Sequence, residues 1–117
     1  MFRRILILFI SSVLWAGPLS LLAVTHSGCP VCNKWHEEVK PYYTFMAQKK
    51  GLPQLKTLDI AKKEGRIKAF KTLGAVENLP TFAIMDEDKV VATFTGYIGY
   101  DNFFAALDKS LKKRAAV

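Results

Sequence analysis

The sequence predicts one α/β domain, a four-stranded mixed sheet flanked by helices with the element order βαβαββα. Short apolar runs of strand length alternate with longer segments in which apolar residues recur at helical spacing. Toward the C-terminal end, two strand-like runs are joined by a short polar turn, which is typical of an antiparallel hairpin. The length of 117 residues suffices for one hydrophobic core but not for two.

The first 18 residues are interpreted as an export segment. Arg3 and Arg4 precede a long apolar run, and Ala16 offers a position for cleavage. A leucine occupies the position three residues before that cleavage site, where a small residue is preferred. Residues 1–18 are therefore expected to be either a signal peptide or an N-terminal membrane anchor, with the folded domain at 19–117. The expected location is periplasmic or otherwise extracytoplasmic.

The first predicted strand, Leu19–Thr25, leads into the motif Cys29-Pro30-Val31-Cys32, which contains both cysteines of the chain. A helix is expected to follow over residues 30–50, because apolar residues recur after the motif at helical spacing. Proline suits the first helical position, since its fixed φ matches the helix and its missing N–H would have had no partner. Cys29 is therefore the expected helix cap.

One apolar stripe is expected along this helix: Val31, Trp35, Val39, Tyr42 and Met46. Pro41 lies inside the helix, where a proline removes one backbone hydrogen bond and clashes with the preceding turn. We expect a kink between Glu37 and Pro41, and a stripe that keeps its phase across the kink.

The position of the motif at a helix N-terminus favours thiol chemistry at Cys29. The N–H groups of the first turn and the helix dipole place partial positive charge beside its sulfur, which favours the thiolate form. Cys29 is therefore the expected nucleophile. Cys32 lies one turn further into the helix, so it can attack a mixed disulfide formed by Cys29 and release the bound partner. This spacing predicts two-cysteine exchange chemistry.

The next elements are a strand over residues 55–60 and a helix over residues 61–73. Ile67, Phe70 and Leu73 are expected to face the core from that helix.

A hairpin and a final helix complete the domain. The hairpin strands are expected at 81–85 and 90–94, joined by the polar turn 86–89. Asp101 or Asn102 can cap the last helix. Its expected apolar face consists of Phe103, Phe104, Leu107 and Leu111.

Three features together resemble the thioredoxin superfamily over residues 19–111: the C-x-x-C after the first strand, the kinked helix, and Leu79-Pro80 before a hairpin strand. The Cys-Pro-x-Cys form is similar to glutaredoxins and to periplasmic disulfide oxidoreductases. With the export segment, the nearest likeness is to small periplasmic thioredoxin-like proteins, including those associated with bacterial sulfur oxidation. The sequence departs from thioredoxins at Ala23, where they have a buried acid that helps proton transfer from the second cysteine. A water or another group must therefore take that proton.

The resemblance implies a thiol–disulfide oxidoreductase that needs no cofactor and exchanges disulfides with protein substrates and a redox partner protein, as a monomer. It also implies that Pro80 is the family's cis-proline, in a substrate groove with Leu79 and Thr81. The residues expected to support the cysteines are Gly28, Pro30, Val31 and His26.

The charge of the chain does not indicate a nucleic-acid partner. The formal net charge is +7, and it falls to +5 without Arg3 and Arg4. The lysines are spread along the chain rather than clustered with aromatic residues, so none of the usual nucleic-acid-binding patterns is present.

A metal carrier remains an alternative. His26, Cys29, Cys32 and His36 form the pattern H-x-x-C-x-x-C-x-x-x-H, with ligand types that suit zinc or copper. This function would need all four side chains to converge from one strand-turn-helix segment. A haem attachment site is excluded, because asparagine follows the second cysteine where that motif needs histidine.

Overall fold

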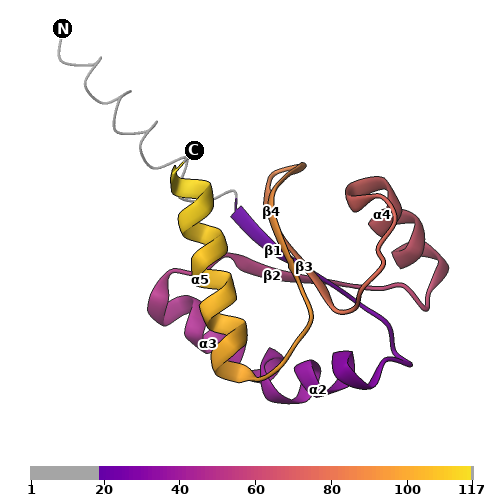
Figure 1. The fold of residues 1–117 in the computed structure, drawn as a ribbon, viewed down its shortest axis with the longest axis horizontal. Helices are drawn as coiled ribbons and strands as arrows, with labels where there is room; N and C mark the ends of the chain where they lie inside the picture. The colour runs from indigo at the N-terminus through magenta and orange to yellow at the C-terminus, as the bar shows by residue number, and fades with distance from the viewer. Residues whose placement is uncertain (1–18, 117) are drawn as a thin grey trace, which may run out of the picture.

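The computed structural model describes residues 19–116. The predicted export segment lies outside the described residues. The elements run in the order β1 (Leu19–Thr25), α2 (Pro30–Glu38), α3 (Lys40–Lys50), β2 (Gln54–Asp59), α4 (Lys63–Leu73), β3 (Thr81–Asp86), β4 (Lys89–Thr95) and α5 (Tyr100–Ala116) (Figure 1). Between Leu19 and Ala116, no helix combines the length and the apolar character needed to cross a membrane.

The strands form one mixed sheet in the order β2-β1-β3-β4. β1 pairs in parallel with β2 and antiparallel with β3, and the hairpin pairs β3 antiparallel with β4. The predicted four-stranded mixed sheet is therefore confirmed. The two central strands, β1 and β3, are almost entirely buried, because helices cover both faces of the sheet there.

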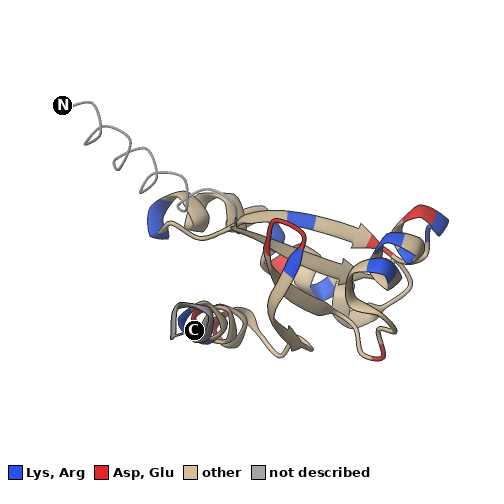
Figure 2. Cartoon of the chain, turned by 90° about the horizontal axis from the view of Figure 1, so that it is seen from above, with Lys and Arg blue, Asp and Glu red and all other residues tan. Residues whose placement is uncertain are grey.

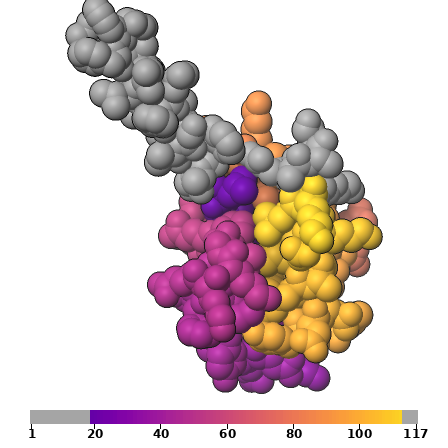
Figure 3. All heavy atoms as spheres, turned by 90° about the vertical axis from the view of Figure 1, so that its left-hand side faces the viewer, coloured from indigo at the N-terminus to yellow at the C-terminus, as the bar shows by residue number. Residues whose placement is uncertain are grey.

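Two groups of buried side chains show which helices cover which face. On one face, Leu21 and Phe82 of the sheet pack with side chains of α2, α3 and α5. On the other face, Leu22 and Ala83 pack with Ala69 of α4. Figure 2 shows α5 nearly end-on, separated from α4 by the strands. In Figure 3, α3 and α5 lie side by side on the outer surface.

The predicted helix over residues 30–50 is broken at Val39 into α2 and α3, within the expected kink region. The prediction that the apolar stripe keeps its phase is wrong, because Tyr43 is 1% exposed while Tyr42 is 58% exposed. The break turns α3 about its axis, so its buried face begins one residue later than the spacing predicts. Val31, the first residue of the predicted stripe, is also exposed.

The face of α4 that meets the sheet also differs from the prediction. Gly65 and Ala69 are buried, whereas Ile67 is 46% and Phe70 66% exposed. The reason is close packing: a Cβ atom on Gly65 would lie 2.2 Å from the carbonyl oxygen of Asp59. Only small residues fit between this helix and the end of β2, so Ile67 and Phe70 are turned outward. Leu73, at the end of the helix, packs against the core as predicted.

The final helix has the predicted apolar face, but it begins at Tyr100, so Asp101 and Asn102 lie inside its first turn and the prediction that one of them caps it is wrong. Phe103 and Leu107 are buried, and Phe104 and Leu111 pack against the same core. The rings of Phe104 and Tyr43 stack with centroids 6.2 Å apart, which joins α5 to α3.

Candidate dithiol site

The Cys-x-x-Cys motif lies at the junction between the central strand β1 and helix α2. Cys29 has an extended backbone (φ −93°, ψ 115°) and occupies the N-cap of α2, with Pro30 at the first helical position. The backbone N–H of Cys32 donates a hydrogen bond to Cys29 Sγ at 3.2 Å. The thiol sulfur of Cys29 thus caps the helix, as a serine or aspartate oxygen would.

The two cysteines are free thiols in different surroundings. Cys29 is partly exposed, whereas Cys32 is fully buried. Burial raises the pKa of the Cys32 thiol to about 11, and the Cys29 side chain adds to this shift. The nearby backbone of His26 acts in the opposite direction and lowers this pKa. The geometry therefore presents one accessible sulfur and one protected sulfur that holds its proton at neutral pH.

The turn between β1 and α2 is fixed by side chains on both sides of it. His26 Nδ1 accepts a hydrogen bond from the Gly28 N–H at 2.9 Å, and the His26 carbonyl accepts one from the Cys29 N–H at 2.9 Å. A Cβ atom at residue 28 would lie 3.3 Å from the His26 ring, which is a tight contact. Asn33 Nδ2 donates to the carbonyl of Ser27 at 3.3 Å.

Asp59, at the end of β2, ties this turn to the neighbouring loop. Its Oδ1 accepts hydrogen bonds from the N–H of Ser27 at 3.2 Å and from the N–H of Ala61 at 2.9 Å. The bond from Ala61 is the main reason why the pKa of Asp59 lies below its ordinary value. Neither Asp59 nor Asn33 is part of the sequence motif. The role of Asp59 depends on pairing between β1 and β2, which the sequence does not specify residue by residue.

The Leu79-Pro80 step lies at the same end of the sheet as the cysteines. Thr81 pairs with Val24 in the antiparallel register of β3 and β1, so the chain before β3 and the chain after β1 leave the sheet together. The Leu79–Pro80 peptide bond is cis, Pro80 is fully buried, and its carbonyl accepts a hydrogen bond from the Gly96 N–H at 2.8 Å.

The side chains of Leu79 and Thr81, the residues before and after Pro80, both make contacts within the domain. Leu79 packs against the core on the α4 face of the sheet. Thr81 is buried, and its hydroxyl donates to the carbonyl of Asn78.

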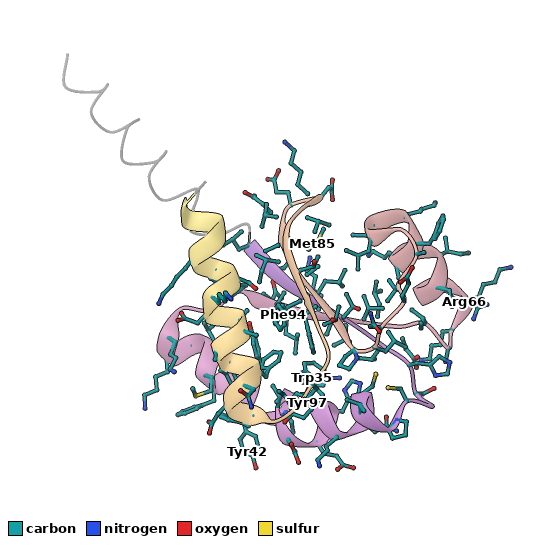
Figure 4. The ribbon with its side chains drawn as sticks, in the orientation of Figure 1. Trp35, Tyr42, Arg66, Met85, Phe94 and Tyr97 are labelled. Atoms are coloured by element: carbon teal, nitrogen blue, oxygen red, sulfur yellow. The ribbon has the colours of Figure 1, made fainter. Side chains whose placement is uncertain are left out.

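Trp35 joins helix α2, which carries the motif, to the sheet. It is fully buried and contacts the rings of Phe82 and Phe103, with centroids 5.3 Å and 6.0 Å away. Figure 4 shows Trp35 pointing from α2 toward the sheet, near Tyr97. Tyr97 in turn donates to Glu38 Oε1 at 2.6 Å, which joins the segment after β4 to the end of α2. The motif helix is thus held firmly on the sheet.

The four potential metal ligands do not gather at one point. His26 Nδ1 is occupied by the Gly28 N–H, and His36 Nε2 lies 3.3 Å from Thr25 Oγ1. In the part of the chain that the structure describes, no group of three or more His, Cys, Asp or Glu side chains is arranged to hold a metal ion. The geometry therefore gives no support to the metal-carrier alternative.

The fold and the position of the motif define the class of this protein: it has the thioredoxin-like fold, with a Cys-x-x-Cys at the start of the helix that follows the central strand. Among solved structures it is similar to the periplasmic thioredoxin SoxS from Paracoccus pantotrophus, with 24% identity and a TM-score of 0.63 over 81% of this chain and 97% of that one. Thioredoxin f from spinach chloroplast is 27% identical, with a TM-score of 0.58 over 87% and 85% of the two chains. Plasmodium falciparum thioredoxin is 15% identical, with a TM-score of 0.59 over 86% and 89%. No protein-family model and no curated protein sequence matches the chain.

Proposed function

We propose that this protein is a thiol–disulfide oxidoreductase that exchanges disulfides with protein partners through Cys29 and Cys32. The observation that carries the proposal is the asymmetry of the pair. The accessible sulfur of Cys29 accepts the Cys32 N–H at the start of a helix, while the sulfur of Cys32 is buried directly behind it. Thioredoxins are the structural neighbours of the chain, and thiol–disulfide exchange is the chemistry of that family.

The proposed reaction has two exchange steps. The Cys29 thiolate attacks one sulfur of a substrate disulfide, forms a mixed disulfide and releases the first substrate thiolate. Cys32 then attacks the Cys29 sulfur, so the Cys29–Cys32 disulfide forms and the second substrate thiolate leaves. Two electrons pass from the dithiol to the substrate. The reverse sequence oxidises a substrate dithiol.

The same end of the sheet offers a place for an extended substrate segment. Leu79, Pro80 and Thr81 lie beside the turn that carries the cysteines, since β3 begins where β1 ends. Backbone groups before a strand can pair with an incoming peptide as an added strand. We assign these three residues to the substrate groove, and Gly28, Pro30, Val31 and His26 to support of the motif.

We also propose that the domain, residues 19–117, works outside the cytoplasm. The apolar, Arg-led residues 1–18 support export, and the structural neighbour SoxS is a periplasmic thioredoxin. One of the solved neighbours is a complex of thioredoxin f2 with ferredoxin:thioredoxin reductase. By analogy, we expect this chain to work with a separate redox partner protein.

The proposal is tested by the reduction of insulin disulfides by dithiothreitol, followed as turbidity. The purified protein is expected to accelerate the reaction, and Cys29→Ser is expected to abolish the acceleration. Lys34→Gln, which changes an exposed residue of the same helix, serves as the matched control and is expected to behave like the parent. A parent protein that is no faster than Cys29→Ser would contradict the proposal.

A further inference from the structure

The second exchange step raises a question of proton transfer. Only the thiolate form of a cysteine is nucleophilic, but burial holds the pKa of Cys32 at about 11. At neutral pH this thiol is almost entirely protonated. Its proton must therefore pass to another group before or while Cys32 attacks the mixed disulfide.

The buried surroundings of Cys32 narrow the choice of acceptor. Ala23, buried in the strand below, has no group that can take a proton. Asp59 accepts hydrogen bonds from the N–H groups of Ser27 and Ala61, and the bond from Ala61 is the main cause of its lowered pKa, so its carboxylate is a weak proton acceptor. His36 lies four residues after Cys32 on α2, and residues at that spacing are neighbours on one face of a helix.

Both side chains lie near the same short segment of the chain, Thr25 and His26. The sulfur of Cys32 interacts with the backbone of His26, and the ring of His36 lies 3.3 Å from the hydroxyl of Thr25, the preceding residue. Thr25 itself is buried at the end of β1. The imidazole of His36 is therefore held against the end of β1, on the face of α2 that it shares with Cys32 by helical spacing.

The contact with Thr25 also orients the ring of His36. The Thr25 hydroxyl donates to the carbonyl of Leu58 at 3.5 Å, so its oxygen is free to accept a hydrogen bond from the His36 Nε2–H. This tautomer leaves the lone pair of Nδ1 available. Partial burial is the main cause of a lowered pKa for His36, so the ring is neutral at pH 7 and able to accept a proton.

Two charged groups act on the ring from neighbouring elements. Lys40, at the start of α3, lowers the pKa of His36, and Asp59, at the end of β2, raises it. The rings of Trp35 and His36 are in T-shaped contact, with centroids 5.1 Å apart. The His36 ring is thus close to one cation, Lys40, one anion, Asp59, and one aromatic ring, Trp35.

We propose that His36 is the proton acceptor for Cys32 in the resolving step, an inference that rests on the proposed exchange function. The Cys32 thiol proton passes to His36 Nδ1, directly or through one water. The Cys32 thiolate then forms a bond to Cys29 Sγ, and the bond between Cys29 and the substrate sulfur breaks. The substrate thiolate leaves with that electron pair, and the imidazolium returns its proton to the thiolate or to solvent.

The experiment follows the two steps separately. Reduced protein is mixed with one equivalent of 5,5′-dithiobis(2-nitrobenzoate) in a stopped-flow instrument, and the released thiol is recorded by absorbance. The first phase reports attack by Cys29 and depends on reagent concentration. The second phase reports attack by Cys32 on the mixed disulfide and is independent of that concentration.

In the parent, the second phase is expected to be nearly constant above about pH 7 and to slow as the pH falls through the lowered pKa of His36. His36→Gln keeps an N–H donor for Thr25 but cannot accept the proton. Its second phase is expected to be about 100-fold slower at pH 7 and to rise about tenfold per pH unit, since only hydroxide then removes the proton. Its first phase is expected to match the parent.

Two further variants provide a control and an independent test of the role of His36. Glu37→Gln changes the exposed neighbour of His36 and is expected to leave both phases unchanged. Lys40→Gln removes the cation that lowers the pKa of His36, so the fall of the second phase is expected to move to higher pH. This shift tests the proposal even if His36→Gln fails to fold.

The outcomes separate the two proposals. A His36→Gln protein with the parental rate and pH profile in the second phase would overturn the role of His36 and leave the exchange function standing. Lys40→Gln with an unshifted profile would also overturn it. A parent protein without a first phase would instead contradict the exchange function itself.

Discussion

The difference between Cys29 and Cys32 comes from one turn of helix. The sulfur of the N-cap residue lies at the surface, where it accepts an N–H, whereas the residue three positions later is turned into the protein. This difference in exposure between the two cysteines could be predicted from the sequence, because Pro30 at the first helical position makes Cys29 the N-cap and places Cys32 inside the first turn. The burial of Cys32, and with it the raised pKa, follows from the same placement.

Asp59 is expected to make the stability of the protein depend on pH. Its pKa is lowered from 3.8 in the folded state, so its contribution to the free energy of unfolding is present above pH 3.8 and is lost as the pH falls through the lower folded value. Asp59→Asn is expected to lower the melting temperature at neutral pH. Because the variant has no carboxylate to protonate, the difference from the parent should narrow as the pH falls below 3.8. A difference that stays constant over this range, in thermal melts followed by circular dichroism, would contradict this account of Asp59.

Gly65 is expected to behave differently from most helical glycines. Replacing a glycine by alanine inside a helix usually stabilises it by up to about 1 kcal/mol. Here a Cβ atom would lie 2.2 Å from the carbonyl oxygen of Asp59. Gly65→Ala is therefore expected to destabilise the protein by about 1–3 kcal/mol in urea unfolding. Lys68→Ala, on the exposed side of the same helix, is the matched control and should change little. A stabilised Gly65→Ala protein would show that α4 lies further from β2.

The break between α2 and α3 determines which side of the second segment faces the core. Val39 lies between the two helices, and its N–H still donates to the carbonyl of Trp35 at 2.9 Å. Pro41 follows two residues later and has no N–H to offer. The new helix therefore starts in its own orientation, and Tyr43 rather than Tyr42 is buried.

The adjacent tyrosines provide a matched pair for testing this orientation. Tyr43 is buried, and its hydroxyl donates to the carbonyl of Pro53 at 2.7 Å. Tyr43→Ala is expected to reduce the free energy of unfolding by about 3–5 kcal/mol, as is typical of large aromatic residues in cores. Tyr42→Ala removes a side chain that points outward and should change it by about 0.5 kcal/mol or less. Equal losses for the two variants, measured by urea unfolding, would contradict the observed orientation of α3.

For the whole molecule, the sequence predicts those features that depend on neighbouring residues. Strand β1, the Cys29 cap and the hairpin follow from local apolar runs and turn residues, and the structure has all three. The orientations of α3 and α4 do not follow in this way. They depend on the rotation introduced at Val39 and on the close approach of Gly65 to β2, and both arise only when the elements pack together.

The same distinction applies to the site. The nucleophile and the resolving cysteine could be predicted from the motif, but the groups around them come from elsewhere in the fold. Asp59 reaches the turn from β2, and Thr25 and His36 meet only because α2 folds back on the end of β1. Residues brought together by tertiary packing leave no signal in the spacing of a single sequence.

The central claim, that the two cysteines perform successive exchange steps, is tested most directly by trapping the intermediate. Cys32→Ser is incubated with an oxidised protein substrate such as insulin, and the covalent complex is measured by mass spectrometry without reductant. This variant is expected to accumulate a mixed disulfide at Cys29 that dithiothreitol releases, because Cys32 is no longer present to resolve it. The parent and Cys29→Ser are expected to accumulate none. Accumulation in Cys29→Ser instead, with none in Cys32→Ser, would contradict the assigned roles of the two cysteines.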